Sequence, residues 1–284
     1  AILMNAPYEA GEDVRPFITV TNMLQSFGLF PPKILAQDVE NGFLLLSDLG
    51  DNLFAKACIS APKTEHKMYR AAIDVLVKLH KHPAPTALPP YDNVVYVREA
   101  KLLTQWYMYN ADSMEFDTIV AKTFAQIPSD NPVLVMRDYH AENLLWRPDA
   151  NGTDRVGLLD YQDALAGHPA YDLVSLLEDA RRDTSTELRN DMIDYYINCT
   201  GVDRDAFLAS YALLGAQRNI KIIGIFARLS LRDGKAHYVD LIARVWDHLM
   251  RDLQHPACAE LSDWVNANVP PPTSAHFATL VRQT

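Results

Sequence analysis

Residues 133–172 read VLVMRDYHAENLLWRPDANGTDRVGLLDYQDALAGHPAYD, and this stretch decides the fold. An apolar run, VLVM, leads into a polar loop that holds Asp138 and, five positions later, Asn143. Two further apolar runs, LLW and VGLLD, flank a turn rich in Asp, Asn and Gly, which is typical of a β-hairpin. The second run ends at Asp160, 17 residues after Asn143. The pattern therefore predicts a loop with an acid and an amide, next to a hairpin that ends in a second acid.

These three side chains match the needs of phosphoryl transfer to an alcohol. One carboxylate has to orient the hydroxyl and accept its proton, while oxygen ligands hold Mg²⁺ against the phosphates of the nucleotide. Mg²⁺ usually takes one or two protein carboxylates, and water and phosphate complete its shell. The spacing predicts Asp138 as the base and Asn143 and Asp160 as ligands of Mg²⁺. The alternative is a solvated loop with incidental acids.

The first 50 residues indicate a small mixed sheet with one helix. Candidate strands are the apolar runs 1–6, 34–38 and 43–46. Asn41-Gly42 lies between the last two runs, and this dipeptide is a strong hairpin signal. Apolar residues at helical spacing predict a helix over 13–27, before Gly28.

From residue 50 onward the pattern is helical. Helices are expected at 65–80, 96–109, 114–126, 170–182, 186–199, 204–232, 235–252 and 257–267. We therefore expect an α+β fold with two lobes. The small β-rich N-terminal lobe covers 1–49 and ends in a hinge, and the large helical C-terminal lobe covers 50–284 with the catalytic loop and the acceptor site.

The sequence motif RDYHAENLLW…GLLDYQDALAGHPAYDL resembles that of the aminoglycoside phosphotransferase/choline kinase family. NAPYEAGEDVRPF, FLLLSDLG and GAQRNIKIIGIFARLSLRDGK are most similar to its cell-wall amino-sugar kinase branch, which phosphorylates the anomeric hydroxyl of N-acetylmuramate and N-acetylglucosamine in peptidoglycan recycling. The resemblance implies a two-lobed protein-kinase-like fold that binds ATP, with backbone groups near Ser47 and Leu49 contacting adenine. It also implies that Asp172 braces the catalytic loop.

The chain departs from the family pattern in the residues expected to bind the nucleotide. Met136 stands where many relatives carry His. The strand AILMNAP has no Lys or Arg, and the helix over 13–27 has no Glu, so the Lys–Glu pair that kinases place on the phosphates is missing. We expect the N-terminal lobe to be truncated, with the phosphate-binding hairpin before residue 1. Alternatively, another cation such as Arg15 takes the place of the Lys.

Candidates for acceptor binding lie in two places. Asp163 either faces the substrate or closes a turn, while His140 is expected to support the loop through its backbone groups. Four cations at 218, 221, 228 and 232 share one stripe of the helix expected over 204–232. They either pair with some of the 36 acids, or Arg218 and Arg228 bind an anionic acceptor such as the lactyl carboxylate of N-acetylmuramate.

The composition of the chain excludes several classes of protein and of binding partner. The 284 residues carry a net charge of −10, which argues against a partner such as nucleic acid or an anionic membrane. No apolar run approaches the about 20 residues of a membrane span. The three cysteines lack metal or disulfide spacing, so we expect a cytoplasmic protein that acts on a small sugar and needs no obligate protein partner. The alternatives are an aminoglycoside or choline-like acceptor, and a pseudokinase that binds nucleotide without turnover.

Overall fold

The computed structural model describes residues 1–7, 11–109 and 114–281, so residues 8–10 of the segment NAPYEAGEDVRPF lie outside the described residues. Contacts divide the chain into two compact units. Unit 1 consists of Ala1–Pro90, Asn131–Leu176 and Ser185–Gly201, and unit 2 consists of Tyr91–Asp130, Leu177–Thr184 and Val202–Thr284. This division differs from the lobe boundary expected after residue 49, which stays a prediction.

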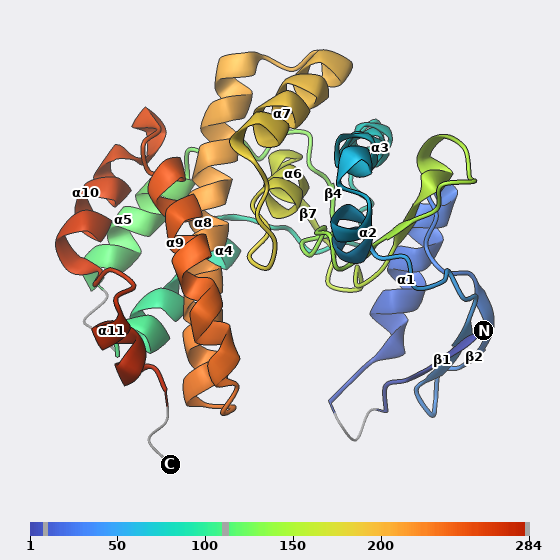
Figure 1. Ribbon diagram of the computed structural model, residues 1–284, viewed down its shortest axis with the longest axis horizontal. Coiled ribbons are helices and arrows are strands. Elements are labelled where there is room, and N and C mark those ends of the chain that lie inside the picture. The colour runs from blue at the N-terminus through green and yellow to red at the C-terminus, as the bar shows by residue number, and fades with distance from the viewer. Residues whose placement is uncertain (8–10, 110–113, 282–284) are drawn as a thin grey trace. The chain divides into compact units, whose positions relative to one another are not determined.

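Unit 1 begins with a three-stranded antiparallel sheet in the order β1-β3-β2 (Figure 1). Its strands are β1 (Ile2–Asn5), β2 (Ile34–Asp38) and β3 (Phe43–Leu46). The turn between β2 and β3 contains Gly42 with a φ of +74°, and a Cβ there would collide with the carbonyl oxygen of Ala6. The hairpin predicted from Asn41-Gly42 is confirmed.

Helix α1 (Val14–Ser26) belongs to the same unit. The side chain of Asp13 caps its first turn by accepting a hydrogen bond from the backbone N–H of Arg15. One face of α1 buries Val14, Phe17, Val20, Thr21 and Leu24, at the helical spacing read from the sequence. The other helices of unit 1 are α2 (Phe54–Ser60), α3 (Glu65–Leu79), α6 (Ala170–Leu177) and α7 (Thr186–Thr200).

Residues 133–172 contain two short antiparallel pairs of strands. β5 (Leu144–Trp146) pairs with β6 (Val156–Leu158), as the hairpin prediction required. β4 (Val133–Val135) pairs with β7 (Leu165–Gly167), a strand that the sequence did not indicate. Every residue of β4, β5 and β6 is buried, so these strands anchor the loops that connect them.

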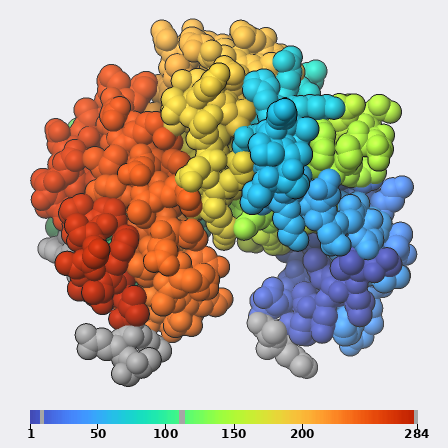
Figure 2. All heavy atoms as spheres, in the orientation of Figure 1, coloured from blue at the N-terminus to red at the C-terminus, as the bar shows by residue number. Residues whose placement is uncertain are grey.

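Unit 2 is built from helices around the 28-residue α8 (Arg204–Leu231), and α9 (Ile242–Asp252) packs along it (Figure 1). α8 also contacts α4 (Asn93–Leu102), where Gly224 leaves no room for a Cβ against the backbone of Leu102. The remaining helices are α5 (Met114–Phe124), α10 (Ala259–Asn268) and α11 (Ser274–Thr279). Figure 2 shows the orange and red atoms of the C-terminal helices closely packed on the visible face.

The α+β class is confirmed, and several helix boundaries are corrected. The helix expected over 96–109 begins at Asn93, because Asp92 caps it, and continues as a π-helical turn over Leu103–Tyr107. The helix expected over 170–182 ends at Leu177. Helices α2 and α11 were not predicted. None of the described helices combines the length and apolarity that crossing a membrane requires.

Candidate active site

The loop that carries Asp138 begins with a left-handed residue. Arg137 has a φ of +72°, and its backbone N–H and that of Met136 both donate to the carboxylate of Asp172, at 2.9 and 2.7 Å. Asp172 is fully buried in the first turn of α6. Ser175, one turn further along α6, donates to the carbonyl oxygen of Arg137 at 3.1 Å. Helix α6 therefore holds both the amide and the carbonyl of the strained residue that precedes Asp138.

Asp138 itself is half-buried, and its backbone forms the turn. Its N–H donates to the carbonyl of Met136, and its carbonyl accepts from the N–H of His140 and from the side chain of Asn143. Among the described residues no hydrogen bond to its carboxylate is formed. The carboxylate oxygens are therefore available to a hydroxyl group from outside.

Asn143 connects the loop to the hairpin. Its Nδ2 donates to the backbone oxygen of Asp138 at 2.9 Å and to Oδ2 of Asp160 at 3.1 Å, and it also lies 3.4 Å from Nε2 of His140. The spacing in the sequence predicted that Asp138, Asn143 and Asp160 lie close together. In the structure the amide of Asn143 joins them through its two hydrogen bonds. The nitrogen of that amide is used within the protein, so its oxygen is the atom that remains for a ligand.

Asp160 lies two residues after the end of β6 and also has a positive φ, +56°. Its side chain is exposed and receives two hydrogen bonds, one on each oxygen. Asn143 donates to Oδ2, and Nε2 of Gln162 donates to Oδ1 at 2.8 Å. Tyr161, between them, is buried, stacks on Phe17 with ring centroids 5.1 Å apart and lies 2.8 Å from Oγ1 of Thr21 through its hydroxyl. Burial also raises the pKa of this phenol.

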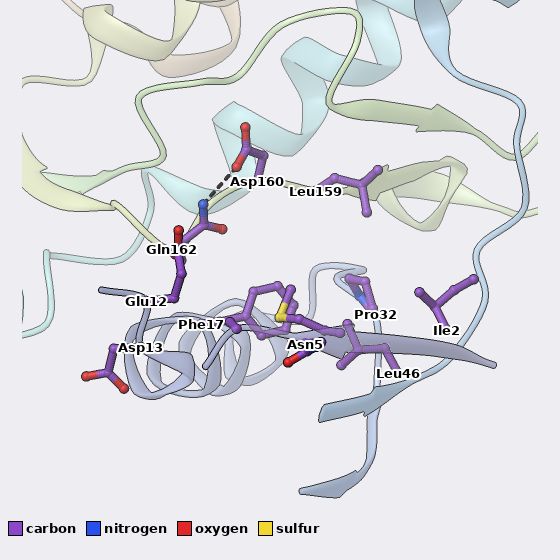
Figure 3. Close-up of a pocket in the computed structure, with 12 residues that line it drawn as sticks. Ile2, Asn5, Glu12, Asp13, Phe17, Pro32, Leu46, Leu159, Asp160 and Gln162 are labelled. Carbon is purple, nitrogen blue, oxygen red and sulfur yellow. Dashed lines mark hydrogen bonds between the residues drawn. The ribbon is translucent and has the colours of Figure 1, made fainter. Parts of the chain in front are cut away.

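A cavity of about 550 Å³ opens beside Asp160 within unit 1 (Figure 3). Strands β1 and β3 contribute apolar side chains on one side, among them Ile2, Met4 and Leu46, and Leu159 lies next to Asp160 on the other. Its polar lining includes Asn5, Glu12, Asp13, Asp160 and Gln162. An apolar compartment next to a metal-ligand candidate is the arrangement that a flat base joined to phosphates requires.

The donor set fits a hard divalent cation. Asn143 and Asp160 offer one amide oxygen and one carboxylate, which are the ligand types that Mg²⁺ takes alongside phosphate oxygens and water. The described residues form no cluster of three or more His, Cys, Asp and Glu side chains suited to a metal. A cation held by Asn143 and Asp160 would therefore need further ligands from outside the protein, such as water or phosphate oxygens.

The residues expected near adenine lie close to this cavity without lining it. Leu46 is a lining residue, and Ser47 follows it directly. The N–H of Ser47 donates to the carbonyl of Lys33 at 2.8 Å, so this group is used within the protein. The side chain of Leu49 packs against Gly157, since a Cβ added to Gly157 would lie 3.1 Å from Cδ1 of Leu49. Ser47 and Leu49 as adenine contacts stay predictions.

A second cavity of about 470 Å³ in unit 1 contains Asp163 and Arg15. Arg15 pairs with Asp13 at 3.1 Å and does not line the cavity beside Asp160. Arg137 and Gln162 also line the second cavity, so Gln162 borders both. The suggested replacement of the missing Lys by Arg15 receives no geometric support here, and Asp163 as a substrate contact stays a prediction.

The basic stripe lies on α8 in unit 2. Arg218 is 4% exposed and donates to the carbonyl of Glu178 at 3.3 Å, and Nζ of Lys221 lies 3.5 Å from Glu99. Arg232 pairs with Asp233 at 2.6 Å. Lys221 and Arg232 therefore follow the alternative in which the stripe pairs with acids, whereas the contact of Arg218 is to a backbone carbonyl. Arg218 and Arg228 as acceptor contacts stay predictions.

Sequence reasoning missed Gln162, Thr21 and Ser175, which hold the site residues in place. Gln162 stood within the quoted motif, two residues after Asp160, and that spacing is the local signal that was available. The contacts of Thr21 and Ser175 depend on the packing of α1 and α6, which no local pattern encodes.

Comparison with solved structures shows the class of fold. A choline/ethanolamine kinase family protein from Mesorhizobium loti superimposes with a TM-score of 0.60 at 12% identity, over 90% of this chain and 79% of that chain. The aminoglycoside phosphotransferase APH(3″)-Id from Streptomyces rimosus, in complex with ADP and streptomycin, gives a TM-score of 0.51 at 17% identity, over 75% and 85% of the two chains. The predicted kinase-like fold is confirmed.

Sequence comparison then gives the family. The profile of the Phosphotransferase enzyme family matches residues 1–208. An N-acetylmuramate/N-acetylglucosamine kinase from Caulobacter vibrioides is 40% identical over 274 residues, which cover 90% of this chain and 75% of that protein. The chain belongs to the Phosphotransferase enzyme family, and it is a small-molecule kinase. The predicted family is thereby confirmed.

Proposed function

We propose that this protein is a cytoplasmic kinase that uses ATP and Mg²⁺ to phosphorylate the anomeric hydroxyl of an N-acetylated amino sugar, N-acetylmuramate or N-acetylglucosamine. One observation carries the proposal: the side chain of Asn143 joins Asp138 to Asp160 by hydrogen bonds of 2.9 and 3.1 Å, and Asp160 lines a cavity with an apolar compartment. The 40% identical relative from Caulobacter vibrioides, which is named as a kinase of these two sugars, supports the acceptor.

Asp138 is the base in this mechanism. Its carboxylate accepts a hydrogen bond from the acceptor hydroxyl and takes the proton as the sugar oxygen forms a bond to the γ-phosphorus. The bond between the γ-phosphorus and the bridging oxygen breaks, ADP leaves, and Asp138 returns its proton to solvent. Asp172 and Ser175 keep Asp138 in place through the backbone of Arg137.

Asn143 and Asp160 hold the magnesium ion with one amide oxygen and one carboxylate. A magnesium ion held there would neutralise charge on the nucleotide phosphates. Backbone groups near Ser47 and Leu49 would bind the adenine ring, which would lie against the apolar lining of the cavity, Met4, Leu46 and Leu159. Asp163, Arg218 and Arg228 remain the candidate acceptor contacts.

A product assay tests the acceptor. The protein is incubated with Mg²⁺-ATP and, separately, with N-acetylmuramate, N-acetylglucosamine, kanamycin or choline, and sugar phosphates are identified by ³¹P NMR. We expect an anomeric phosphate from the two amino sugars and at least about tenfold lower kcat/KM for the other acceptors, which is the discrimination that 1.4 kcal/mol provides. Faster turnover of kanamycin or choline would overturn the amino-sugar assignment. Nucleotide binding without product from any acceptor would leave a pseudokinase.

A further inference from the structure

We propose that Gln162 is a positioning residue that fixes the carboxylate of Asp160 in the orientation needed to bind Mg²⁺ and nucleotide. The inference rests on the proposed function, because it concerns the same metal site. It assigns a role to a side chain that was not among the site residues predicted from the sequence.

The contact between Gln162 and Asp160 has a defined direction. Nε2 of Gln162 lies 2.8 Å from Oδ1 of Asp160, and a carboxylate only accepts hydrogen bonds, so the amide nitrogen must face it. Asn143 donates to the other oxygen, Oδ2, at 3.1 Å. The two donors come from different segments, one from the catalytic loop and one from the turn after β6.

Asp160 needs such restraint because little else holds it. Its side chain is exposed, its φ is +56°, and these are its only side-chain hydrogen bonds among the described residues. Glu12 and Asp13 line the same cavity and add negative charge beside it (Figure 3). A neutral donor at position 162 orients the carboxylate without adding to that charge.

Gln162 is itself held in place by its neighbour. Tyr161 is fully buried against Phe17, and its hydroxyl lies 2.8 Å from Thr21 of α1. The backbone of the turn is therefore anchored on one side, and the half-buried Gln162 extends back to Asp160.

The two hydrogen bonds leave room for a ligand. Each carboxylate oxygen has two lone pairs, and each accepts only one hydrogen bond from these donors. A carboxylate that is already oriented loses less conformational freedom when it binds a metal. Loss of Gln162 should therefore weaken the binding of Mg²⁺ with nucleotide and leave acceptor binding unchanged.

The variant Gln162→Met tests this, because it keeps the length of the side chain and removes the donor. Gln126→Met is the matched control, since Gln126 donates to the backbone carbonyls of Thr123 and Ala257 in unit 2. The readout is the melting-temperature shift caused by ADP as Mg²⁺ is titrated, without acceptor and without turnover. We expect the half-saturating Mg²⁺ concentration to rise about 5- to 20-fold in Gln162→Met and to stay unchanged in the control. The KM for the acceptor should change less than about twofold.

A purely structural role predicts a different result. If Gln162→Met and Gln162→Ala lower the melting temperature but keep the wild-type Mg²⁺ dependence, the positioning role is wrong. Asp160→Asn separates this failure from failure of the proposed function. If Asp160→Asn abolishes the Mg²⁺-dependent shift while Gln162→Met does not alter it, only the role of Gln162 is overturned. If Asp160→Asn also keeps the wild-type dependence, the metal site of the proposed function fails.

Discussion

Each unit of the molecule contains an asparagine whose side-chain amide donates to carboxylates, and the two clusters differ in burial. In unit 1, Asn143 donates to Asp160, which is exposed beside a cavity. In unit 2, Nδ2 of Asn219 donates to Oε2 of Glu178 at 2.8 Å and to Oδ2 of Asp252 at 2.9 Å, and all three residues are at most 4% exposed. An asparagine thus donates to acids beside a cavity in one cluster and in the interior in the other.

The difference shows how burial decides the use of an acid. Burial, and after it the charge of Glu178, raise the pKa of Asp252 well above its usual range, so this carboxyl keeps its proton to a higher pH than in the unfolded chain. Arg251 lies 3.4 Å from Glu178 and offsets the charge there. The buried cluster is hydrogen-bonded within the protein and stabilises the packing of α8 and α9, whereas the exposed cluster keeps its oxygens for ligands.

The largest effect is expected from Asp138→Asn in the exposed cluster. The change removes the proposed base, and general-base catalysis contributes about 10²- to 10⁴-fold to a rate. We expect kcat to fall within that range while the melting temperature stays within about 2 °C, because the carboxylate has no hydrogen bond among the described residues to lose. Steady-state kinetics and thermal melting measure the two quantities.

The control for this prediction is Asp149→Asn, the same chemical change at an exposed position in the turn between β5 and β6. Its kcat should match that of the wild type. A folded Asp138→Asn protein that keeps its turnover would falsify the assignment of the base.

The sequence predicted the exposed cluster better than the buried one, and the reason is locality. Asp138, Asn143 and Asp160 lie on one hairpin-linked stretch, so their spacing alone brings them together. Glu178, Asn219 and Asp252 come from three segments far apart in the sequence, the residue after α6, α8 and α9, which meet only in the tertiary structure.

The basic stripe on α8 illustrates the same limit. A helical wheel places Arg218 and Lys221 on one side of the helix, but it carries no information on what covers that side. The structure buries both residues and places Glu178 and Glu99 beside them. Periodicity therefore predicted the helix and the shared face, and the partners required the tertiary structure.

The next prediction concerns two variants, in which either Asn143 or Asn219 is replaced by leucine. Asn219→Leu leaves the buried side chains of Glu178 and Asp252 without this donor, and each unsatisfied buried group costs about 1–3 kcal/mol. We expect the free energy of unfolding to fall by about 3 kcal/mol, with an unchanged Mg²⁺ requirement. Asn143→Leu should lower stability by only about 1 kcal/mol and raise the half-saturating Mg²⁺ concentration at least about tenfold.

Urea denaturation and the Mg²⁺ titration of the ADP-induced melting shift measure both variants. The comparison predicts that Asn219→Leu changes mainly the free energy of unfolding and that Asn143→Leu changes mainly the Mg²⁺ requirement. If Asn219→Leu alters the Mg²⁺ requirement as strongly as Asn143→Leu does, the buried cluster is not merely structural.

The smallest expected effect is a pH dependence of stability that Asp252→Asn removes. The folded protein keeps the proton of Asp252 at pH values at which the unfolded chain, with a pKa of about 3.9, has released it. The stabilising contribution of this carboxyl is therefore complete below that unfolded value and is lost as the pH rises. Asparagine cannot release a proton, so the variant should gain stability relative to the wild type between pH 5 and pH 8, by more than about 1 kcal/mol. Urea denaturation of both proteins at the two pH values measures this difference. If the free energies of unfolding of the variant and the wild type differ by the same amount at pH 5 and at pH 8, Asp252 is ionised in the folded protein. The two clusters would then differ in packing alone.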